Sequence, residues 1–422
     1  MIPLVFIATV FLFSQKTFAA PDSQIPPLSL GELTEQLHLN NPQLKQAQQN
    51  YFAEKAAIPQ ATALNNPQLG IIESPIPPNS LLIDQAAGLS YTLTQSFSFP
   101  GKKHLAGRIA EAQADIAQTV VDALSLQLIA QLKNDFYQLL VLQEQSEINQ
   151  ENIQRLEQIK QIAKVKYANS AAAYVDFLNA QVSKSSAEND QFALQRQIDT
   201  ARQTLNTLVG RDSLTPLTVK GELPDTKLPQ KSLAELETLA LVNNPQIKSS
   251  SLQIRSSSKG LTLAKMSYVP DFQFILTNAS DTSPWGYGEL GNNYGVEFDL
   301  VLPTWFLSKE RSQVSQAKAN LLASQANDQS IRQQTRLSVD TIYNTLAQAV
   351  HQSDFIKTRQ LEEARTAFRL GITSYASGNA SLSDILTAQT NLRNTELQLL
   401  ESRYTATQAF NNLVAAVGRD LE

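Results

Sequence analysis

An internal duplication limits the possible folds of this chain more than any other feature. Four short segments of the first half recur in the second half, in the same order and with similar residues. The matched segments are 29–33 with 232–236, 40–43 with 243–246, 176–181 with 384–389, and 209–212 with 417–420. We therefore expect two structural repeats, over residues 21–212 and 232–422, joined by a proline-containing linker at 213–231.

Each repeat contains a long stretch that is suited to an unbroken helix. Residues 108–167 and 304–370 contain neither glycine nor proline, and an α-helix over either one would extend about 90 to 100 Å. A short turn then leads into a second stretch of the same kind. This pattern predicts two antiparallel helical hairpins, over residues 101–210 and 304–417.

The spacing of apolar residues along these stretches indicates how the helices pack. Apolar side chains recur three and four residues apart, which is the pattern of a seam between long helices. The other positions carry mostly Gln, Ala, Ser and Asn, and Asn149 and Asn152 are examples. We expect these polar faces to contact water or a partner chain.

Capping motifs mark the first helices of each repeat. Residues 29–32 and 232–235 both have the Ser-x-x-Glu spacing of a capping box, in which the hydroxyl and the carboxylate each bind a free backbone amide. Asn41 and Asn244 each precede a proline and are suited to cap a second helix. The opening helix of each repeat is therefore expected to break and restart.

Alternating apolar and polar residues predict one β-hairpin in each repeat. The longer strands cover about 87–99 and 293–302, and shorter partners precede them at about 67–73 and 271–279. The predicted fold class is therefore mainly α-helical with a small β part. It combines duplicated long-helix hairpins with four β-strands per chain.

Two interpretations of these strands are open. In the first, they form a soluble ribbon packed on the helices. In the second, they cross an outer membrane, where strands must close into a barrel of at least about eight because hydrocarbon offers no hydrogen-bond partners. Four strands cannot close alone, so identical copies would supply the remainder, and three copies would yield about twelve strands.

On the barrel interpretation, the polar positions of the strands face a water-filled lumen. These positions are Ser90, Thr92, Thr94, Glu297 and Asp299. Glu297 and Asp299 lie two residues apart and share one face of a strand, so a lumen-wetting role is favoured over general acid–base catalysis.

The composition argues against several kinds of site. The chain has no Cys, two Met and three His that are far apart in the sequence, so we expect neither a thiol nucleophile nor a resident metal centre. The net charge of −5 gives no basic field for nucleic acid. We expect no enzyme activity and no cofactor.

Residues 1–20 are typical of a secretory signal peptide. An apolar run at 2–13 precedes small residues that end at Ala19 and Ala20. A chain cleaved there has no cysteine for a lipoprotein anchor. No later apolar run is long enough for a transmembrane helix.

With these features together, nearly the whole mature sequence resembles the TolC-type outer-membrane efflux channels of Gram-negative bacteria. Family members often read Arg-Tyr-x-x-Gly-x-x-Ser-x-x-Asp-x-Leu-x-Ala-Gln where a long helix turns back. This chain has Tyr375, Gly378, Ser381, Asp384, Leu386, Ala388 and Gln389 in register, with Ser374 in place of the arginine. The first repeat keeps Lys166, Tyr167 and Asp176, but it has Ser170 in place of the glycine and Ala173 in place of the serine.

A second resemblance concerns one branch of this family. Residues 95–103 read Gln-Ser-Phe-Ser-Phe-Pro-Gly-Lys-Lys. This segment is similar to the Pro-Gly-Lys-Arg segment that is common in the heavy-metal cation branch, whose channels work with CzcA- or CusA-like pumps.

The resemblance implies an assembly, a location and a function. It implies a homotrimer in the outer membrane whose twelve-stranded β-barrel continues into a periplasmic α-helical barrel. A periplasmic adaptor and an inner-membrane RND-type pump would dock at the closed helical tip. The chain would then be the passive exit duct of a tripartite efflux system, with divalent metal cations as candidate substrates.

The same resemblance, joined to the symmetry of a trimer, suggests residues for the tip. The candidates for the pore constriction or gate are Asp384, Asp176, Tyr375 and Tyr167. The candidates for adaptor docking are Ser170, Gly378 and Ser381. Three copies of an aspartate around one axis would favour cations, but both aspartates have a second interpretation as helix caps. The tyrosines have a second interpretation as buried packing residues.

Two other functions are open at this point. The same channel could serve a drug exporter or a type I protein secretion system. A protein of another class, a periplasmic coiled-coil adaptor or tether without a pore, would also use long helical hairpins.

Overall fold

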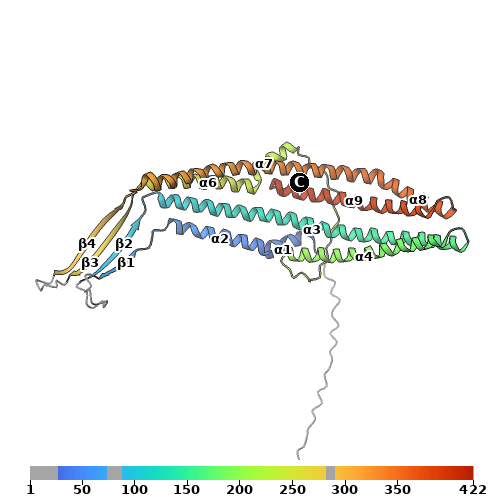
Figure 1. Ribbon diagram of the computed structural model, residues 1–422, viewed down its shortest axis with the longest axis horizontal. Coiled ribbons are helices and arrows are strands. Elements are labelled where there is room, and N and C mark those ends of the chain that lie inside the picture. The colour runs from blue at the N-terminus through green and yellow to red at the C-terminus, as the bar shows by residue number, and fades with distance from the viewer. Residues whose placement is uncertain (1–26, 74–87, 282–289, 422) are drawn as a thin grey trace, which may run out of the picture.

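The protein is a long bundle of helices with a small sheet at one end (Figure 1). The computed structural model describes residues 27–73, 88–281 and 290–421. The predicted signal peptide at 1–20 lies outside the described residues. In Figure 1 the strands lie at the left end of the molecule and the turns of two helical hairpins lie at the right end. The prediction of a mainly α-helical fold with a small β part is confirmed.

The first half of the chain has the element order that its sequence predicts. The elements are α1 (Leu30–Asn40), α2 (Pro42–Thr62), β1 (Gln68–Glu73), β2 (Gly88–Phe97), α3 (Lys102–Ala168) and α4 (Tyr174–Leu208). Ser29 and Glu32 form the predicted capping box, and the Asn41 side chain accepts a hydrogen bond from the Leu44 amide at 3.0 Å. The 67 residues of α3 extend about 100 Å at 1.5 Å per residue.

The second half repeats this order with three additional short turns. Its elements are α5 (Leu233–Asn243), α6 (Pro245–Lys265), the 3₁₀ turn η2 (Met266–Tyr268), β3 (Asp271–Asp281), β4 (Leu290–Val301), η3 (Phe306–Glu310), α7 (Arg311–Phe355), η4 (Ile356–Gln360), α8 (Leu361–Ser377) and α9 (Leu382–Val417). Ser232 and Glu235 form the second capping box. Asn244 caps α6, and its amide also donates to the Ala416 carbonyl at the end of α9, at 2.8 Å.

The long helix of the second half differs from its prediction. An uninterrupted helix was expected over 304–370, but a π-helical turn, η3, begins it and a second π turn, η4, separates α7 from α8. The matching helix α3 is continuous. A π turn adds one residue to a helical turn without glycine or proline, so neither residue type marks it in the sequence.

The four described strands form one antiparallel sheet in the order β1-β2-β3-β4. The register pairs Thr94 with Ile275 and Ile275 with Glu297, so these three positions share one face. The same register places all the predicted lumen residues on that face, namely Ser90, Thr92, Thr94, Glu297 and Asp299. On the opposite face the ring of Phe272 stacks on that of Phe97 at 5.4 Å and lies 5.8 Å from that of Phe298.

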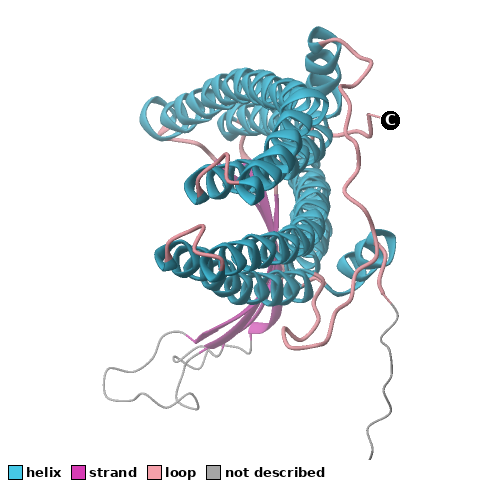
Figure 2. Cartoon of the chain, turned by 90° about the vertical axis from the view of Figure 1, so that its right-hand side faces the viewer, coloured by secondary structure: helices cyan, strands magenta, loops and turns pink. Residues whose placement is uncertain are grey.

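Among the described residues, two apolar cores lie one in each half, and two smaller apolar clusters link the halves. The first joins α1 to α4 and includes Leu33, Leu132 and Leu205. The second joins α5, α7 and α9 and includes Leu236 and Leu346. Seen end-on, the helices lie along a curved wall that is open on one side (Figure 2). Among the described residues, no helix combines the length and the apolar character that a membrane span requires.

The linker at 213–231 packs against both halves. Leu223 is buried in a cluster with Val141 of α3 and Leu400 of α9. Its carbonyl accepts a hydrogen bond from Arg403 of α9 at 2.7 Å. Near the linker's start, Val219 forms a parallel bridge with Leu28. The linker therefore joins the two helical hairpins near the middle of the bundle.

Candidate functional site at the helical hairpin ends

The two hairpin turns have the same backbone geometry. At the end of α8, Gly378 has φ 87°, its amide donates to the Tyr375 carbonyl at 3.2 Å, and the Asn379 amide donates to the Ser374 carbonyl at 2.8 Å. At the end of α3, Ser170 has φ 58° and the equivalent bonds are 2.9 and 2.8 Å. This is the Schellman ending of a helix, which normally uses glycine. Ser170 therefore adds backbone strain at this turn, while the turn keeps the same hydrogen-bond pattern as the one at Gly378.

Lys166 joins the two hairpins next to these turns. It lies in the last turn of α3, and its ammonium donates to the Tyr375 carbonyl of α8 at 2.6 Å. The same ammonium lies 4.6 Å from the centre of the Tyr375 ring, in a cation–π contact. A lysine near the end of a helix is also favoured by the negative end of the helix dipole. Lys166 thus links the last turn of α3 to the last turn of α8.

Tyr375 is buried, with 2% of its surface exposed, whereas Tyr167 is 48% exposed. Burial, and to a lesser degree the negative charge of Asp176, raises the pKa of the Tyr375 hydroxyl. This hydroxyl has no hydrogen-bond partner among the described residues. The Tyr167 ring instead packs against Tyr174 at 5.2 Å on the outside of the first turn. Only Tyr375 of the two therefore contacts the other hairpin through Lys166.

A groove of about 780 Å³ lies between the two hairpin ends. Six residues that the sequence analysis singled out line it: Lys166, Asp176, Tyr375, Gly378, Ser381 and Leu386. The structure thus brings together one aspartate, one tyrosine and two of the three docking candidates. Asp384, Tyr167 and Ser170 lie in or next to the same turns and are exposed.

Asp384 forms a capping box with Ser381. Its Oδ2 accepts hydrogen bonds from the Ser381 amide at 2.9 Å and from the Ser381 hydroxyl at 2.7 Å, and the Asp384 amide donates to that hydroxyl at 3.2 Å. These bonds lower the pKa of the Asp384 carboxyl. In the first hairpin Ala173 occupies the cap position and forms no side-chain bond, so Asp176 has no equivalent role. The capping box is therefore formed by Asp384 and not by Asp176. Asp176 nevertheless lies in the first turn of α4, where the helix dipole favours a carboxylate.

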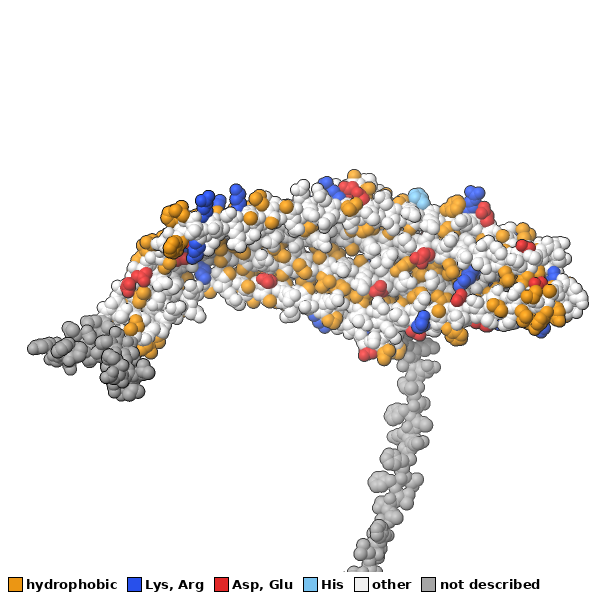
Figure 3. Space-filling model, viewed as in Figure 1, with side chains coloured by type: hydrophobic (Ala, Val, Ile, Leu, Met, Phe, Trp, Pro, Cys, Tyr) orange, Lys and Arg blue, Asp and Glu red, His pale blue; other side chains and the backbone are white. Residues whose placement is uncertain are grey.

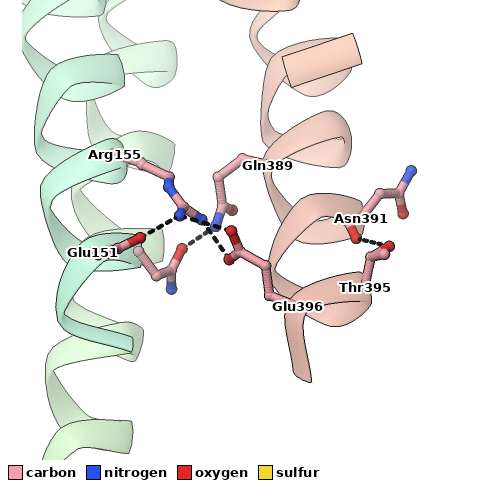
Figure 4. A network of polar contacts seen from close by, with 7 residues as sticks. Glu151, Arg155, Gln389, Asn391, Thr395 and Glu396 are labelled. Atoms are coloured by element: carbon pink, nitrogen blue, oxygen red, sulfur yellow. Dashed lines mark hydrogen bonds and ion pairs between the residues drawn. The ribbon is translucent and has the colours of Figure 1, made fainter. Parts of the chain in front are cut away.

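Further from the turns, a layer of polar side chains joins α3 to α9 (Figure 4). The guanidinium of Arg155 donates to both carboxylate oxygens of Glu396, at 2.8 and 2.9 Å, and also pairs with Glu151 at 2.7 Å. Gln389 donates to Asn152 beside this cluster. A bidentate, largely buried pair of this kind is stronger than a surface ion pair.

This layer corrects the expectation for the polar helix faces. Asn149 and Asn152 were expected to contact water or a partner chain, but they are 2% and 3% exposed. Asn149 donates to the Ala187 carbonyl and to Gln191 of α4, both at 2.9 Å. The sequence analysis also missed Arg155 and Glu396, because a single Arg or Glu on a polar helix face gives no sign of a partner 241 residues away.

Long paired helices that end in a sheet with one polar and one apolar face are the parts of an outer-membrane channel subunit. The comparisons with known proteins agree. The family model for outer membrane efflux proteins matches residues 33–211 and 236–419, so the chain belongs to the outer membrane efflux protein family. The predicted TolC-type fold, the outer-membrane location and the role as an efflux exit duct are thereby confirmed.

Three known proteins illustrate this relationship. The cobalt-zinc-cadmium resistance protein CzcC of Cupriavidus metallidurans is 22% identical over 368 residues, which cover 85% of each chain. The pyoverdine export outer membrane protein OpmQ of Pseudomonas aeruginosa is 21% identical over 345 residues, which cover 79% of this chain and 69% of OpmQ. The outer-membrane channel OprN has a similar structure, with a TM-score of 0.80, 17% identity, and coverage of 93% of this chain and 90% of OprN.

The first prediction concerns the strained turn at Ser170. Ser170→Gly should raise the free energy of unfolding by about 1 kcal/mol, because glycine adopts a positive φ without steric cost. Gly378→Ala should lower it by a similar amount. Gly260→Ala serves as the control, since this helical position has open space and alanine should stabilise it by about 1 kcal/mol. Urea unfolding in detergent measures all three, and a loss of stability in Ser170→Gly would contradict the prediction.

The second prediction concerns the Asp384 cap. A carboxyl whose pKa is lowered on folding contributes stability above its unfolded pKa of about 4, and loses that contribution as the pH falls through the folded value. Asp384→Asn should therefore lower the thermal midpoint at neutral pH and have progressively less effect below about pH 4. Ser381→Ala removes the hydroxyl donor, the larger of the two causes that lower this pKa, and leaves the backbone amide donor in place, so it should show a weaker effect with a similar pH dependence. Midpoints that fall equally at all pH values would contradict the assignment.

Proposed function

We propose that three copies of this chain form the outer-membrane exit duct of a tripartite efflux system that exports divalent metal cations. The observation that carries the proposal is the sheet. Within the described residues β1 and β4 each pair on one side only, and the two faces differ in polarity. In hydrocarbon such free edges must pair, so neighbouring copies complete a closed wall around a polar lumen.

The proposed lumen is lined by Ser90, Thr92, Thr94, Glu297 and Asp299, which share one face of the sheet. Threefold repetition would place carboxylates around the lumen and would favour the passage of cations. No step in this function needs catalysis by the chain, because an inner-membrane RND-type pump supplies the energy and a periplasmic adaptor connects the two.

At the other end of the duct, the hairpin ends form the proposed gate. Lys166 with Tyr375, and Arg155 with Glu396, hold the two hairpins of one chain together. The capping bonds of Asp384 both use Oδ2, which leaves Oδ1 to face the axis in a ring of three carboxylates. Asp176 contributes negative charge beside Tyr375. Ser170, Gly378 and Ser381 are exposed at the turns and are the proposed contacts of the adaptor.

The metal cargo rests on the similarity to CzcC, a cobalt-zinc-cadmium resistance protein, and on the Pro-Gly-Lys-Lys segment at residues 100–103. A second candidate cargo is an organic molecule, because OpmQ, a pyoverdine export protein, matches almost as well. Both cargos use the same duct and the same gate.

The third prediction separates the two cargos. A strain that lacks this gene should grow less well on cobalt, zinc or cadmium salts, and the intact gene should restore growth. Export of the strain's own siderophore, measured in the medium, is the matched comparison. Lost siderophore export with unchanged metal tolerance would favour the organic cargo and contradict the metal proposal.

The fourth prediction tests the gate. The double variant Lys166→Met, Arg155→Met removes two of the polar links between the hairpins and leaves the Arg393–Asp190 pair in place. Because fewer contacts then hold the hairpins together, channels in a planar bilayer should show a several-fold higher conductance or open fraction. Arg365→Met is the control, because Arg365 lies on the exposed surface of α8 and its one ion pair among the described residues is with Glu362 of the same helix. If the double variant conducts no more than this control, the links do not hold the gate closed.

A further inference from the structure

The segment at residues 302–311 connects β4 to α7 and exposes an unusual set of side chains; we call it the collar. Four of its apolar side chains are exposed: Leu302, Trp305, Phe306 and Leu307. Trp305 and Leu307 are the most open of them, at 70% and 73%. Large apolar side chains that lie together on a surface mark a site of contact with a partner or a membrane.

The backbone of the collar is ordered by its own hydrogen bonds. The Trp305 carbonyl accepts from the amides of Ser308 and Lys309, at 3.0 and 2.9 Å, within the π turn η3. Glu310 is buried at the end of this turn. The turn therefore directs the carboxylate inward while the aromatic and basic side chains on either side of it stay exposed.

The collar continues the apolar face of β4. Along that strand Tyr294, Val296, Phe298 and Leu300 alternate on one face and all are exposed. Leu302 is the next position of the same alternation. This face of a barrel wall contacts lipid, and the helices that begin after the collar lie in the periplasm. The collar thus lies where the lipid-facing surface meets water on the periplasmic side.

The exposed charges of the collar are of one sign, since its carboxylate, Glu310, is buried. Lys309 and Arg311 are exposed, and neither forms an ion pair in the part of the chain that the structure describes. Figure 3 shows hydrophobic side chains beside Lys and Arg side chains at the bend where the strands meet the helices. Aromatic side chains at the level of lipid headgroups, followed by cations on the water side, match the chemistry of a phospholipid surface.

We propose that the collar inserts into the periplasmic leaflet and binds anionic phospholipid. Trp305, Phe306 and Leu307 occupy the boundary between headgroups and acyl chains, and Lys309 and Arg311 bind the lipid phosphates. This inference rests on the outer-membrane location of the family and is independent of the proposed cargo. Its function is to fix the height of the barrel in the membrane where the rigid helices begin.

Fluorescence of Trp305 tests the proposal. Trp285 is the other tryptophan of the sequence, so Trp285→Phe leaves Trp305 as the single reporter. The protein is placed in vesicles of phosphatidylcholine and phosphatidylglycerol in which one lipid at a time carries bromine, either near the glycerol or near the chain end. We expect the strongest quenching from bromine near the glycerol, and several-fold stronger quenching from phosphatidylglycerol than from an equal fraction of phosphatidylcholine.

Matched variants separate binding of the anionic headgroup from simple burial of the collar. Lys309→Gln with Arg311→Gln should abolish the preference for phosphatidylglycerol, whereas Arg336→Gln, at an exposed cation far along α7, should retain it. No quenching by any brominated lipid would mean that another copy covers the collar, and equal quenching by both lipids would exclude recognition of the anionic headgroup. Either result overturns the proposal. Conductance measured on the same samples shows separately whether the duct is intact.

Discussion

Backbone amide and carbonyl groups in a lipid environment must find hydrogen-bond partners within the protein, and this requirement governs the architecture. β2 and β3 satisfy it from both sides, whereas β1 and β4 are paired on one side only in the described sheet. The four-stranded sheet of a single chain would therefore leave unpaired backbone groups along both of its edges in a membrane. The helical part follows from this, since curved helical walls attached to sheets of a closed barrel must themselves close into a tube.

The helical wall is held by two kinds of contact with different consequences. Near the middle of the bundle, continuous apolar cores and the linker around Leu223 join the helices. Toward the hairpin ends, ion pairs and amide contacts such as Arg155 with Glu396 are added to a smaller apolar cluster that includes Tyr375. A buried ion pair contributes little net stability but is costly to break on one side only, so it favours one defined arrangement. That property suits the gate that we propose at the hairpin ends.

The collar and the proposed gate lie at opposite ends of the long helices, and each lies at a backbone irregularity. The π turn η3 precedes α7 at the membrane end, and left-handed residues Ser170 and Gly378 end α3 and α8 at the other. A regular helix does not change direction sharply. Side chains can therefore point toward a membrane, or toward a second hairpin, where the backbone turn is irregular.

The sequence alone determined the features that depend on neighbours in the chain. Capping boxes at Ser29 and Ser232 set helix starts, and period-two alternation in 87–99 set which strand residues share a face. Only the tertiary structure decided the links between Lys166 and Tyr375, between Arg155 and Glu396, and the burial of Asn149. The reason is physical: caps and alternation are local, whereas a polar residue on a long helix gives the same pattern whether it faces water or a partner more than two hundred residues away.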